Sequence, residues 1–369
     1  MKTLPIIYKR TQTGAIQQWE IVTGGNTFWT VEGQVGGKLT TSMPTLVEGK
    51  NIGRSNETSD EEQAFKEAES RWKKKLEKGY FEDINSIDNK KKFFEPMLAH
   101  KYVDFKDSID FPVLVSPKID GCRMVATKDG LFTRNGKEYV SCPHIHEALK
   151  PVFKQFPNWV IDGEIYSHDE KFEKIISLVK KTKPTENDLI ESEKLIKLWV
   201  FDGTVGTALG FEDRFYSIRE VISKYAGTKY IKFVENEVAK NHKEVQAAHD
   251  KYVGEGFEGA MIRVPHSAYE NKRSKNLLKF KMFLDKEFII VDVEEGKGNR
   301  SGMAGKLILK MDNCKLFGAG IRGDEEYYKE LLKNRNKLIG KKATIRYQNL
   351  SEDGIPRFPI AINIAPIDR

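Results

Sequence analysis

Cysteine is scarce in this 369-residue chain, which contains only Cys122, Cys142 and Cys314. Their number is odd and their spacing is wide, so they form neither a zinc-ligand pattern nor a disulfide framework. Such cysteine usage is typical of a reducing compartment, and we expect the chain in the cytosol. The sequence also lacks an apolar run long enough to span a membrane and an N-terminal signal peptide, so we expect no membrane partner.

The phosphate-binding loop of P-loop enzymes is absent as well. No Gly-rich segment followed by a lysine stands between a predicted strand and a predicted helix. The net charge of +7 is modest, and it is compatible with a polyanionic partner without requiring one. Hydrophobic residues make up 39% of the chain, enough for true cores, and its length suggests two or three domains.

A set of short polar patches follows in a definite order along the chain, each at the edge of an apolar run. An Asp-Gly pair by itself indicates only an ordinary turn. Together, however, the patches supply what phosphorus chemistry needs: carboxylates that hold Mg²⁺ and cations that neutralise phosphate oxygens. The patches are Lys118-Ile119-Asp120-Gly121-Cys122-Arg123, Asp162-Gly163-Glu164, Phe201-Asp202-Gly203, Glu258-Gly259 with Arg263, and Lys279-Phe280-Lys281.

Lys118 is the candidate nucleophile, because no P-loop assigns it to another task. A lysine attacks only as the neutral amine, so its unperturbed pKa of about 10.4 must be lowered. Desolvation and nearby cations lower it, and Lys279, Lys281, Arg123 and a bound metal are the candidate cations. Lys118 follows the apolar run 111–115, which predicts a buried strand, and precedes a Gly turn. We therefore expect its side chain to point into a cleft.

In this order the patches resemble the nucleotidyltransferase motifs of the ATP-dependent DNA ligase family, over roughly residues 94 to 369. In that family the motif lysine takes AMP from ATP as a phosphoamide. The AMP then passes to the 5′-phosphate of a nick, and the 3′-hydroxyl displaces it. The resemblance implies ATP and Mg²⁺, or Mn²⁺ in its place, as cofactors. It also implies nicked duplex DNA as partner, a monomer, and the cytosol of a bacterium or of a virus-infected host.

The resemblance also implies a role for each matching residue. Lys118 becomes the AMP-lysine nucleophile, with Asp120 and Arg123 completing its motif. Phe201 stacks on adenine, Glu164 contacts the ribose or a metal, and Glu258 is a metal ligand. The other nucleotide contacts match the family's arginine motif and its paired lysines, and they are Arg134, Lys279 and Lys281.

Several of these residues also have a purely structural interpretation. Phe201 lies in the apolar run 198–201 and suits a core, and Glu164 and Glu258 suit solvated loops. Lys279 and Lys281 alternate with apolar neighbours, which predicts a strand with one solvated face. Both lysines then share one side, which is also what a phosphate clamp needs.

Residues 1–90 form the first predicted domain, a small α+β module. Short strands around residues 6–8, 18–22 and 28–31 precede a helix that begins near Thr58-Ser59-Asp60-Glu61-Glu62 and runs to about Gly79. The segment resembles a WGR-type module of DNA-repair proteins through Trp29, Gly33, Gly36, Gly37 and Lys78-Gly79-Tyr80, although Trp-Gly-Arg itself is absent. This implies DNA binding through Lys73 and Lys74; a spacer with a solvated basic helix is the alternative.

Residues 91–284 form the second predicted domain, after a charged linker from Glu82 to Lys92. We expect an α/β nucleotidyltransferase fold of the ATP-grasp-like ligase type, with antiparallel sheets and flanking helices. Helices are predicted at Ser217 to Tyr225 and His242 to Val253. The polar stretch from Lys180 to Lys197 is predicted to be a surface insertion.

Residues 285–369 form the third predicted domain, a small barrel of short strands with a helix at Glu325 to Leu338. In ligases this part is an OB-fold, and segment 296–305 resembles its first loop. Two interpretations are open for Lys297, Arg300 and Lys306: they contact DNA phosphates, or they belong to a loop that is merely flexible. Pro356-Arg357-Phe358-Pro359 resembles the start of the family's last motif. Ala365 and Pro366 stand where its basic residue is expected, which leaves Arg357 or Arg369 as substitutes.

The resulting prediction is an ATP-dependent DNA ligase that seals nicks. An RNA ligase and a messenger-RNA capping guanylyltransferase share the lysine mechanism and remain alternatives, and nucleotide choice separates the latter. A non-catalytic DNA-end-binding protein is the alternative of another class. The presence of every expected catalytic side chain from Lys118 to Lys281 argues against it.

Overall fold

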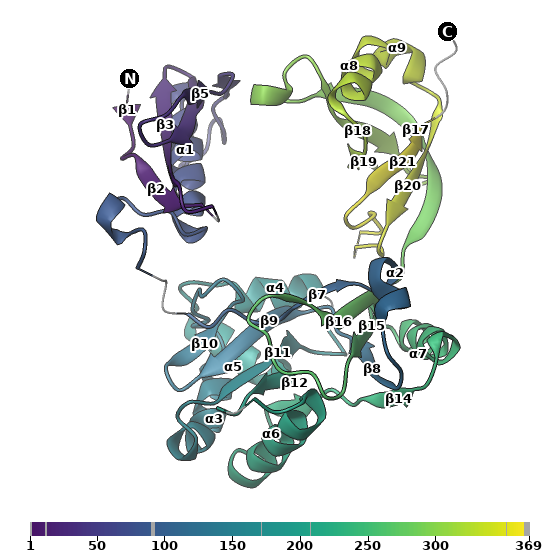
Figure 1. The fold of residues 1–369 in the computed structure, drawn as a ribbon. Coiled ribbons are helices and arrows are strands. Elements are labelled where there is room, and N and C mark those ends of the chain that lie inside the picture. Colours follow the sequence, from purple (N-terminus) through teal and green to yellow (C-terminus); the bar gives the residue numbers. More distant parts are fainter. Residues whose placement is uncertain are drawn as a thin grey trace. The chain divides into compact units, whose positions relative to one another are not determined.

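The computed structural model describes residues 2–11, 13–89, 93–170, 172–206, 208–351 and 353–364 (Figure 1). Part of the predicted linker, at 90–92, and Ala365, Pro366 and Arg369 of the last motif lie outside the described residues. The chain divides into two compact units, one of residues 93–283 and one comprising 1–92 and 284–369, and each is described by itself. No helix in the described part of the chain is both long and apolar enough to cross a membrane.

The N-terminal segment is an antiparallel sheet with one helix, which confirms the predicted small α+β arrangement. Helix α1 (Asp60–Glu77) begins at Ser59, whose side chain forms a capping box with Glu62. The helix packs Ala64 and Ala68 on the core of the sheet. The strands are β1 (Lys2–Thr3), β2 (Ile7–Arg10), β3 (Ile16–Gly24), β4 (Thr27–Gln34), β5 (Leu39–Thr41) and β6 (Thr45–Leu46), and the short η1 (Ile84–Ser86) follows α1.

The central unit contains two five-stranded sheets. The first has the order β10-β9-β11-β12-β13, formed by β9 (Cys122–Thr127), β10 (Gly130–Phe132), β11 (Val160–Tyr166), β12 (Lys197–Thr204) and β13 (Ile231–Phe233). The second has the order β14-β8-β15-β16-β7, formed by β7 (Leu98–Lys101), β8 (Val113–Lys118), β14 (Glu237–Ala239), β15 (Gly259–Arg263) and β16 (Arg273–Lys281). The prediction of antiparallel sheets is wrong at two pairs, since β12–β13 and β16–β7 run parallel.

Helices of the central unit pack on both sheets. Buried residues of α3 (Pro143–Gln155) and α6 (Phe211–Tyr225) share one core with the first sheet, and α7 (His242–Gly254) shares another with the second. Helix α7 confirms its prediction, whereas α6 begins six residues before the predicted start. The predicted insertion 180–197 contains α5 (Glu186–Leu195), and α4 (Phe172–Val179) precedes it. The short α2 (Tyr102–Phe105) and η2 (Lys106–Ser108) follow β7.

The C-terminal segment is a closed barrel with the strand order β17-β18-β19-β21-β20, which confirms the barrel prediction. Its strands are β17 (Leu284–Glu295), β18 (Ala304–Lys310), β19 (Leu316–Ile321), β20 (Lys342–Tyr347) and β21 (Ile360–Ile364). The short η3 (Gly298–Arg300) lies in the predicted loop 296–305. The helix predicted over 325–338 is divided at Asn334 into α8 (Glu325–Lys333) and α9 (Arg335–Leu338).

Candidate active site

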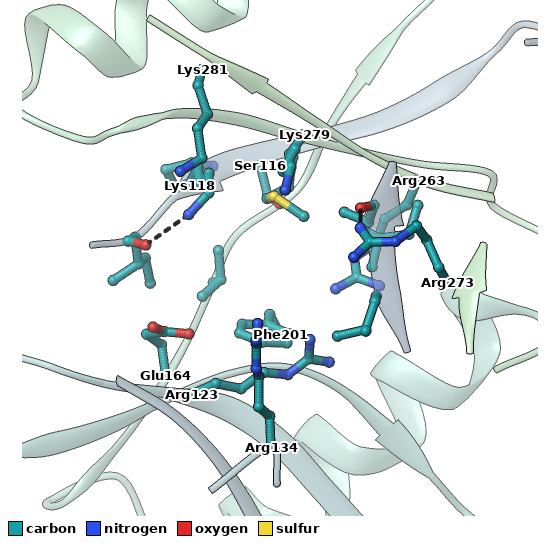
Figure 2. A pocket seen from close by; sticks show the side chains of 17 residues that line it. Ser116, Lys118, Arg123, Arg134, Glu164, Phe201, Arg263, Arg273, Lys279 and Lys281 are labelled. Carbon is teal, nitrogen blue, oxygen red and sulfur yellow. Dashed lines mark hydrogen bonds between the residues drawn. The ribbon is translucent and has the colours of Figure 1, made fainter. Parts of the chain in front are cut away.

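Residues from both sheets of the central unit line one cavity of about 280 Å³. Figure 2 shows Lys118, Lys279 and Lys281 on one side of this space and Glu164, Arg123 and Arg134 on the other. All seven residues predicted to bind the nucleotide are therefore brought together. The charged lining residues are Lys118, Arg123, Arg134, Glu164, Arg263, Arg273, Lys279 and Lys281.

Strand register aligns the predicted lysines of the second sheet. Lys118, the last residue of β8, pairs across the sheet with Gly259 of β15, and Gly259 pairs on its other side with Lys281 of β16. Lys279 lies two residues before Lys281, so both lysines share one face of β16. The alternation that suited a solvated face therefore places both lysines on the cavity.

The Glu258 carboxylate lies between Lys118 and Lys281. One carboxylate oxygen pairs with Lys118 Nζ, and the other pairs with Lys281 Nζ. The Glu258 side chain is only 7% exposed, so it is not a solvated loop carboxylate. Burial alone would raise the pKa of Glu258, but the charges of Lys118 and Lys281 lower it below its ordinary value.

A glycine is required at position 259, where β15 pairs with Lys118 of β8 on one side and with Lys281 of β16 on the other. Its φ is +144°, and a Cβ there would lie 2.1 Å from the Phe280 carbonyl oxygen. Any other residue would therefore push β15 away from β16. Glu258 directly precedes Gly259, so the position of its carboxylate depends on this close approach of β15 and β16.

Arg123 and Glu164 are cross-strand partners on β9 and β11 of the first sheet. Glu164 is half-buried, and burial raises its pKa to about 7 against the opposing charges of Lys118 and Arg123. Burial also lowers the pKa of Lys279, with help from the charges of Lys281 and Arg273. Arg134 lines the cavity from the turn after β10 and is exposed.

Phe201 occupies a β-bulge on β12. Asp162 of β11 pairs with Asp202, whereas Gly163 pairs with Val200, so Phe201 is an extra residue without a partner on β11. Bulges re-aim side chains and are common beside active sites. The Phe201 ring is half-buried: it packs against the core of the first sheet and also lines the cavity.

Two guanidinium groups lie near the Phe201 ring, Arg123 at 5.4 Å and Arg263 at 5.5 Å from its centroid. Arg123 Nε donates to Asp162 Oδ1 at 2.8 Å, and Arg263 Nη1 donates to Asp202 Oδ2. Burial would lower the pKa of Arg123, but the charge of Asp162 raises it overall. The pKa of Arg263 is lowered, chiefly by burial. Both arginines are thus held by aspartates that are at most 1% exposed.

Asp120 is placed outside the cavity lining. It lies in the turn between β8 and β9, beside Gly121, where a Cβ would lie 2.3 Å from the Ile165 carbonyl oxygen. Burial and then the Asp120 charge raise the pKa of Tyr166 to about 12. The catalytic role of Asp120 stays a prediction.

The predicted DNA-binding residues belong to the other unit. Lys306 pairs with Glu294 at 2.9 Å, and the Arg300 guanidinium lies 5.1 Å from the Tyr328 ring centroid. Lys297 directly precedes η3 in the same loop. Arg357 donates its amide to the Asn349 carbonyl oxygen at 2.8 Å, and the alternative substitute Arg369 lies outside the described residues.

Lys73 and Lys74 differ in their surroundings on α1. Lys73 pairs with Glu69 at 2.9 Å. Lys74 lines a groove of about 340 Å³, which we call the basic groove and which is formed by Trp19, Thr30, Arg71, Lys74, Lys75 and Lys78.

Sequence reasoning missed the buried groups that hold the two arginines. Asp162 and Asp202 stand inside the polar patches but had no assigned role, although their position next to Glu164 and Phe201 was a usable signal. Arg214 Nε donates to Asp202 Oδ1 at 2.7 Å, and the Tyr269 hydroxyl donates to Asp162 Oδ2 at 2.6 Å. No local pattern identifies Arg214 or Tyr269, because their partners are distant in sequence.

Glu164 and Glu258 are the predicted metal ligands at this site. Glu164 lines the cavity, whereas Glu258 is not among the lining residues and would have to exchange a lysine partner for the ion. In the described residues, no group of three or more His, Cys, Asp or Glu side chains is arranged to hold a metal. Mg²⁺ typically uses one or two carboxylates and takes its remaining ligands from substrate phosphates and water. The two glutamates therefore fit a Mg²⁺ that is shared with a nucleotide.

Comparison with known families gives two matches. Residues 96–281 match the ATP dependent DNA ligase domain, and residues 295–364 match the DNA ligase OB-like domain. The second match agrees with the closed barrel of the C-terminal segment.

Curated relatives and solved structures agree with these matches. A DNA ligase of African swine fever virus (isolate Tick/South Africa/Pretoriuskop Pr4/1996) is 28% identical over 341 residues, covering 85% of this chain and 77% of its own length. A DNA ligase of Haemophilus influenzae is 27% identical over 249 residues, covering 66% of this chain and 84% of its own. A structure from a study of Lig E DNA ligases shares the fold, with a TM-score of 0.61 and 22% identity over 74% of this chain and 99% of that chain. The chain belongs to the ATP-dependent DNA ligase family.

Proposed function

We propose that this ligase seals nicks in duplex DNA through a covalent AMP on Lys118. The Lys118 nitrogen attacks the α-phosphorus of ATP, so that a P–N bond forms, the amine loses its proton and the bond to pyrophosphate breaks. The AMP then passes to the 5′-phosphate of the nick, and the 3′-hydroxyl displaces it as the phosphodiester forms. The position of Lys118 Nζ on the cavity, beside Glu258 and opposite Glu164, carries the proposal.

The cations and the ring of the cavity suit the parts of ATP. Phe201 offers a flat face for adenine, as aromatic side chains do for nucleic-acid bases. Lys279 and Lys281 share the face that carries Lys118, where they neutralise phosphate charge. Arg134, which is exposed, and Arg123 complete the set of nucleotide contacts.

Glu164 and Glu258 are proposed to hold Mg²⁺. When bound, the ion shields the negative charge of the phosphates during transfer. Glu258 keeps its negative charge because Lys118 and Lys281 lower its pKa, which suits a metal ligand.

The basic groove is proposed to contact the DNA backbone. Arg71, Lys74 and Lys78 are exposed there, and Lys75 lies over the Trp19 ring at 4.8 Å from its centroid. Cations that neutralise phosphates supply most non-specific DNA affinity. Lys73 is the weaker of the two predicted contacts because of its pairing with Glu69.

Other predictions for this ligase remain proposals. They are the likeness of residues 1–90 to a WGR-type module, DNA contacts by Lys297, Arg300 and Lys306, a monomeric state and a cytoplasmic location. Lys297 and Arg300 stand on the loop between β17 and β18 and Lys306 lies near the start of β18, and the excess of positive charge over the chain favours a DNA partner.

Sealing of a singly nicked duplex with ATP and Mg²⁺ tests the proposal. The full chain should join the strands, and Lys118→Ala should neither join them nor become labelled by ATP that carries a radioactive α-phosphate. Lys128→Ala, an exposed lysine paired with Asp129, is the matched control and should retain activity. A labelled Lys118→Ala protein would refute the assignment of the nucleophile. Failure of the unmodified chain to seal would redirect the lysine chemistry to GTP or RNA.

A further inference from the structure

Tyr269 joins the two sheets of the nucleotide cavity through its hydroxyl group. It lies in the connection between β15 and β16 of the second sheet, and its hydroxyl donates to Asp162 Oδ2, on β11 of the first sheet, at 2.6 Å. The same oxygen accepts the Met97 amide at 3.0 Å. The Phe94 ring packs against it, with centroids 5.5 Å apart. One side chain thus connects the first sheet, the second sheet and the segment that enters the unit.

Asp162 links the Tyr269 hydroxyl to Arg123 through hydrogen bonds. The carboxylate is fully buried and accepts hydrogen bonds from both Nε and Nη2 of Arg123, in addition to the one from Tyr269. A bidentate pair fixes the plane of a guanidinium group, and a third donor fixes the carboxylate itself. The orientation of Arg123 near the Phe201 ring therefore depends on the Tyr269 hydroxyl.

The Tyr269 ring also lies near Arg214, which belongs to the network around Asp202. The Arg214 guanidinium lies 5.6 Å from its centroid, and Arg214 also donates to the Ser267 carbonyl oxygen in the same loop. Arg214 and Arg263 both bond to the carboxylate of Asp202. The loop that carries Tyr269 is thus bound to both networks, and each network holds one of the arginines near Phe201.

We propose that Tyr269, acting through Asp162, is a positioning residue that sets the geometry of the base-binding end of the cavity. The inference rests on the proposed function, because it takes this cavity as the ATP site. Without the hydroxyl, the Met97 amide and one Asp162 oxygen each lose a partner, and the carboxylate is free to rotate with Arg123. Stacking of a base on Phe201 requires that the guanidinium groups beside the ring stay in place.

Binding of the non-hydrolysable analogue α,β-methylene-ATP, measured by calorimetry on the full chain, tests the inference without using Lys118 chemistry. Tyr269→Phe keeps the ring and removes only the hydroxyl, and we expect its dissociation constant to rise roughly fivefold to tenfold. Asp162→Asn should weaken binding similarly. The double variant should be about as weak as the weaker single variant, because both changes act through Arg123.

Ile222→Val is the matched control for lost stability. Ile222 is fully buried in the core that α6 shares with the first sheet and does not line the cavity. Its melting temperature should fall while its affinity for the analogue stays unchanged. If Tyr269→Phe does not fold, Asp162→Asn carries the same comparison.

The outcomes separate this inference from the proposed function. If the unmodified chain does not bind the analogue, the cavity is not the ATP site and both proposals fail. If it binds and Tyr269→Phe binds equally well, only the positioning role is overturned. A loss of affinity in Ile222→Val as large as that in Tyr269→Phe would assign the effect to general stability and also overturn it.

Discussion

Glu258 and Lys118 are joined twice, once through the main chain and once through their side chains. The Glu258 amide donates to the Lys118 carbonyl oxygen at 2.9 Å, and the Glu258 carboxylate pairs with Lys118 Nζ. The first bond adjoins the pairing of β8 with β15, so the carboxylate stays close to the amine while the sheet is intact. Any ligand that takes the Glu258 carboxylate therefore also alters the surroundings of Lys118.

Glu258→Ala should impair the metal-dependent steps most. Both lysines lose their shared partner, and the proposed metal loses one of its two carboxylates. We expect the Mg²⁺ concentration for half-maximal enzyme–AMP formation to rise roughly tenfold or more. Titration of Mg²⁺ at saturating ATP measures this, with the exposed Glu255→Ala as control. An unchanged Mg²⁺ dependence in Glu258→Ala would count against the metal role.

Glu164 should make the stability of the chain depend on pH. Its pKa of about 7 in the folded state lies above its ordinary value of 4.5, so the folded state binds more protons between these pH values. The free energy of unfolding should therefore fall as pH rises from about 4.5 to about 7.

Glu164→Gln removes this dependence, because an amide does not ionise. The free energy of unfolding of Glu164→Gln minus that of the unmodified chain should therefore increase by on the order of 2 kcal/mol between pH 4 and pH 8. Urea denaturation across this range, without nucleotide or metal, provides the measurement. Glu220→Gln, on the exposed face of α6, should show no such difference, and parallel curves for Glu164→Gln and the unmodified chain would refute the prediction.

Asp202→Ala should destabilise the central unit by about 3 kcal/mol or more, because it leaves two buried guanidinium groups without their carboxylate. Arg214 and Arg263 are only 2% and 4% exposed. Chemical denaturation should show the loss directly, and the exposed Glu220→Ala should stay within about 0.5 kcal/mol of the unmodified chain. A loss as small as that of the control would mean that the two arginines find other partners.

Paired substitutions in the basic groove should weaken DNA binding and reduce its dependence on salt. Lys74→Gln with Lys78→Gln removes two candidate phosphate contacts, so the slope of log K against log salt should become shallower by about 2. Titration of a nicked duplex over a range of salt concentrations measures the slope. Lys38→Gln with Lys66→Gln, outside the groove, should leave it unchanged.

Self-adenylylation separates DNA binding from chemistry. The groove variant should form enzyme–AMP at the rate of the unmodified chain, and deletion of residues 1–90 should have the same pattern. Unaltered nick binding in both would make the N-terminal segment a spacer or a protein-binding unit.

Local periodicity was sufficient to predict the strands that carry the lysines. Lys118 ends an apolar strand, and Lys279 and Lys281 alternate with apolar residues, so both features can be read within a few residues. The pairing of Glu258 with lysines of both strands depends on contacts between distant segments and was not predicted, because the family resemblance implied only a metal ligand at Glu258. For the same reason, the buried roles of Asp162 and Asp202 were missed.

Helix starts show a similar limit. Helices α1, α7 and α8 begin after Ser59, Asn241 and Asp324, whose side chains cap them, and all were predicted near their true starts. Helices α3 and α6 follow Cys142 and Gly210 without a side-chain cap, and they were missed or begun late. At α6 the Pro265 carbonyl oxygen accepts the Glu212 amide instead, a contact that no local sequence pattern shows.

Helix α5 is different, because its start was visible. Thr185 forms a full capping box with Asp188, yet the stretch was predicted from its charged composition only as a surface insertion, and no helix was predicted within it. A usable capping signal was therefore overlooked.

The bulge at Phe201 gives the site a particular sensitivity to changes in chain length. A regular strand turns adjacent side chains to opposite faces, so it offers only one of two consecutive residues to a given side. The extra residue on β12 lets Phe201 line the cavity while the next residue, Asp202, bonds Arg263, which lines the same cavity. Deleting one residue at this point would leave either the Phe201 ring or the Asp202 carboxylate in place, but not both. Many point substitutions elsewhere on the strand would leave both in place.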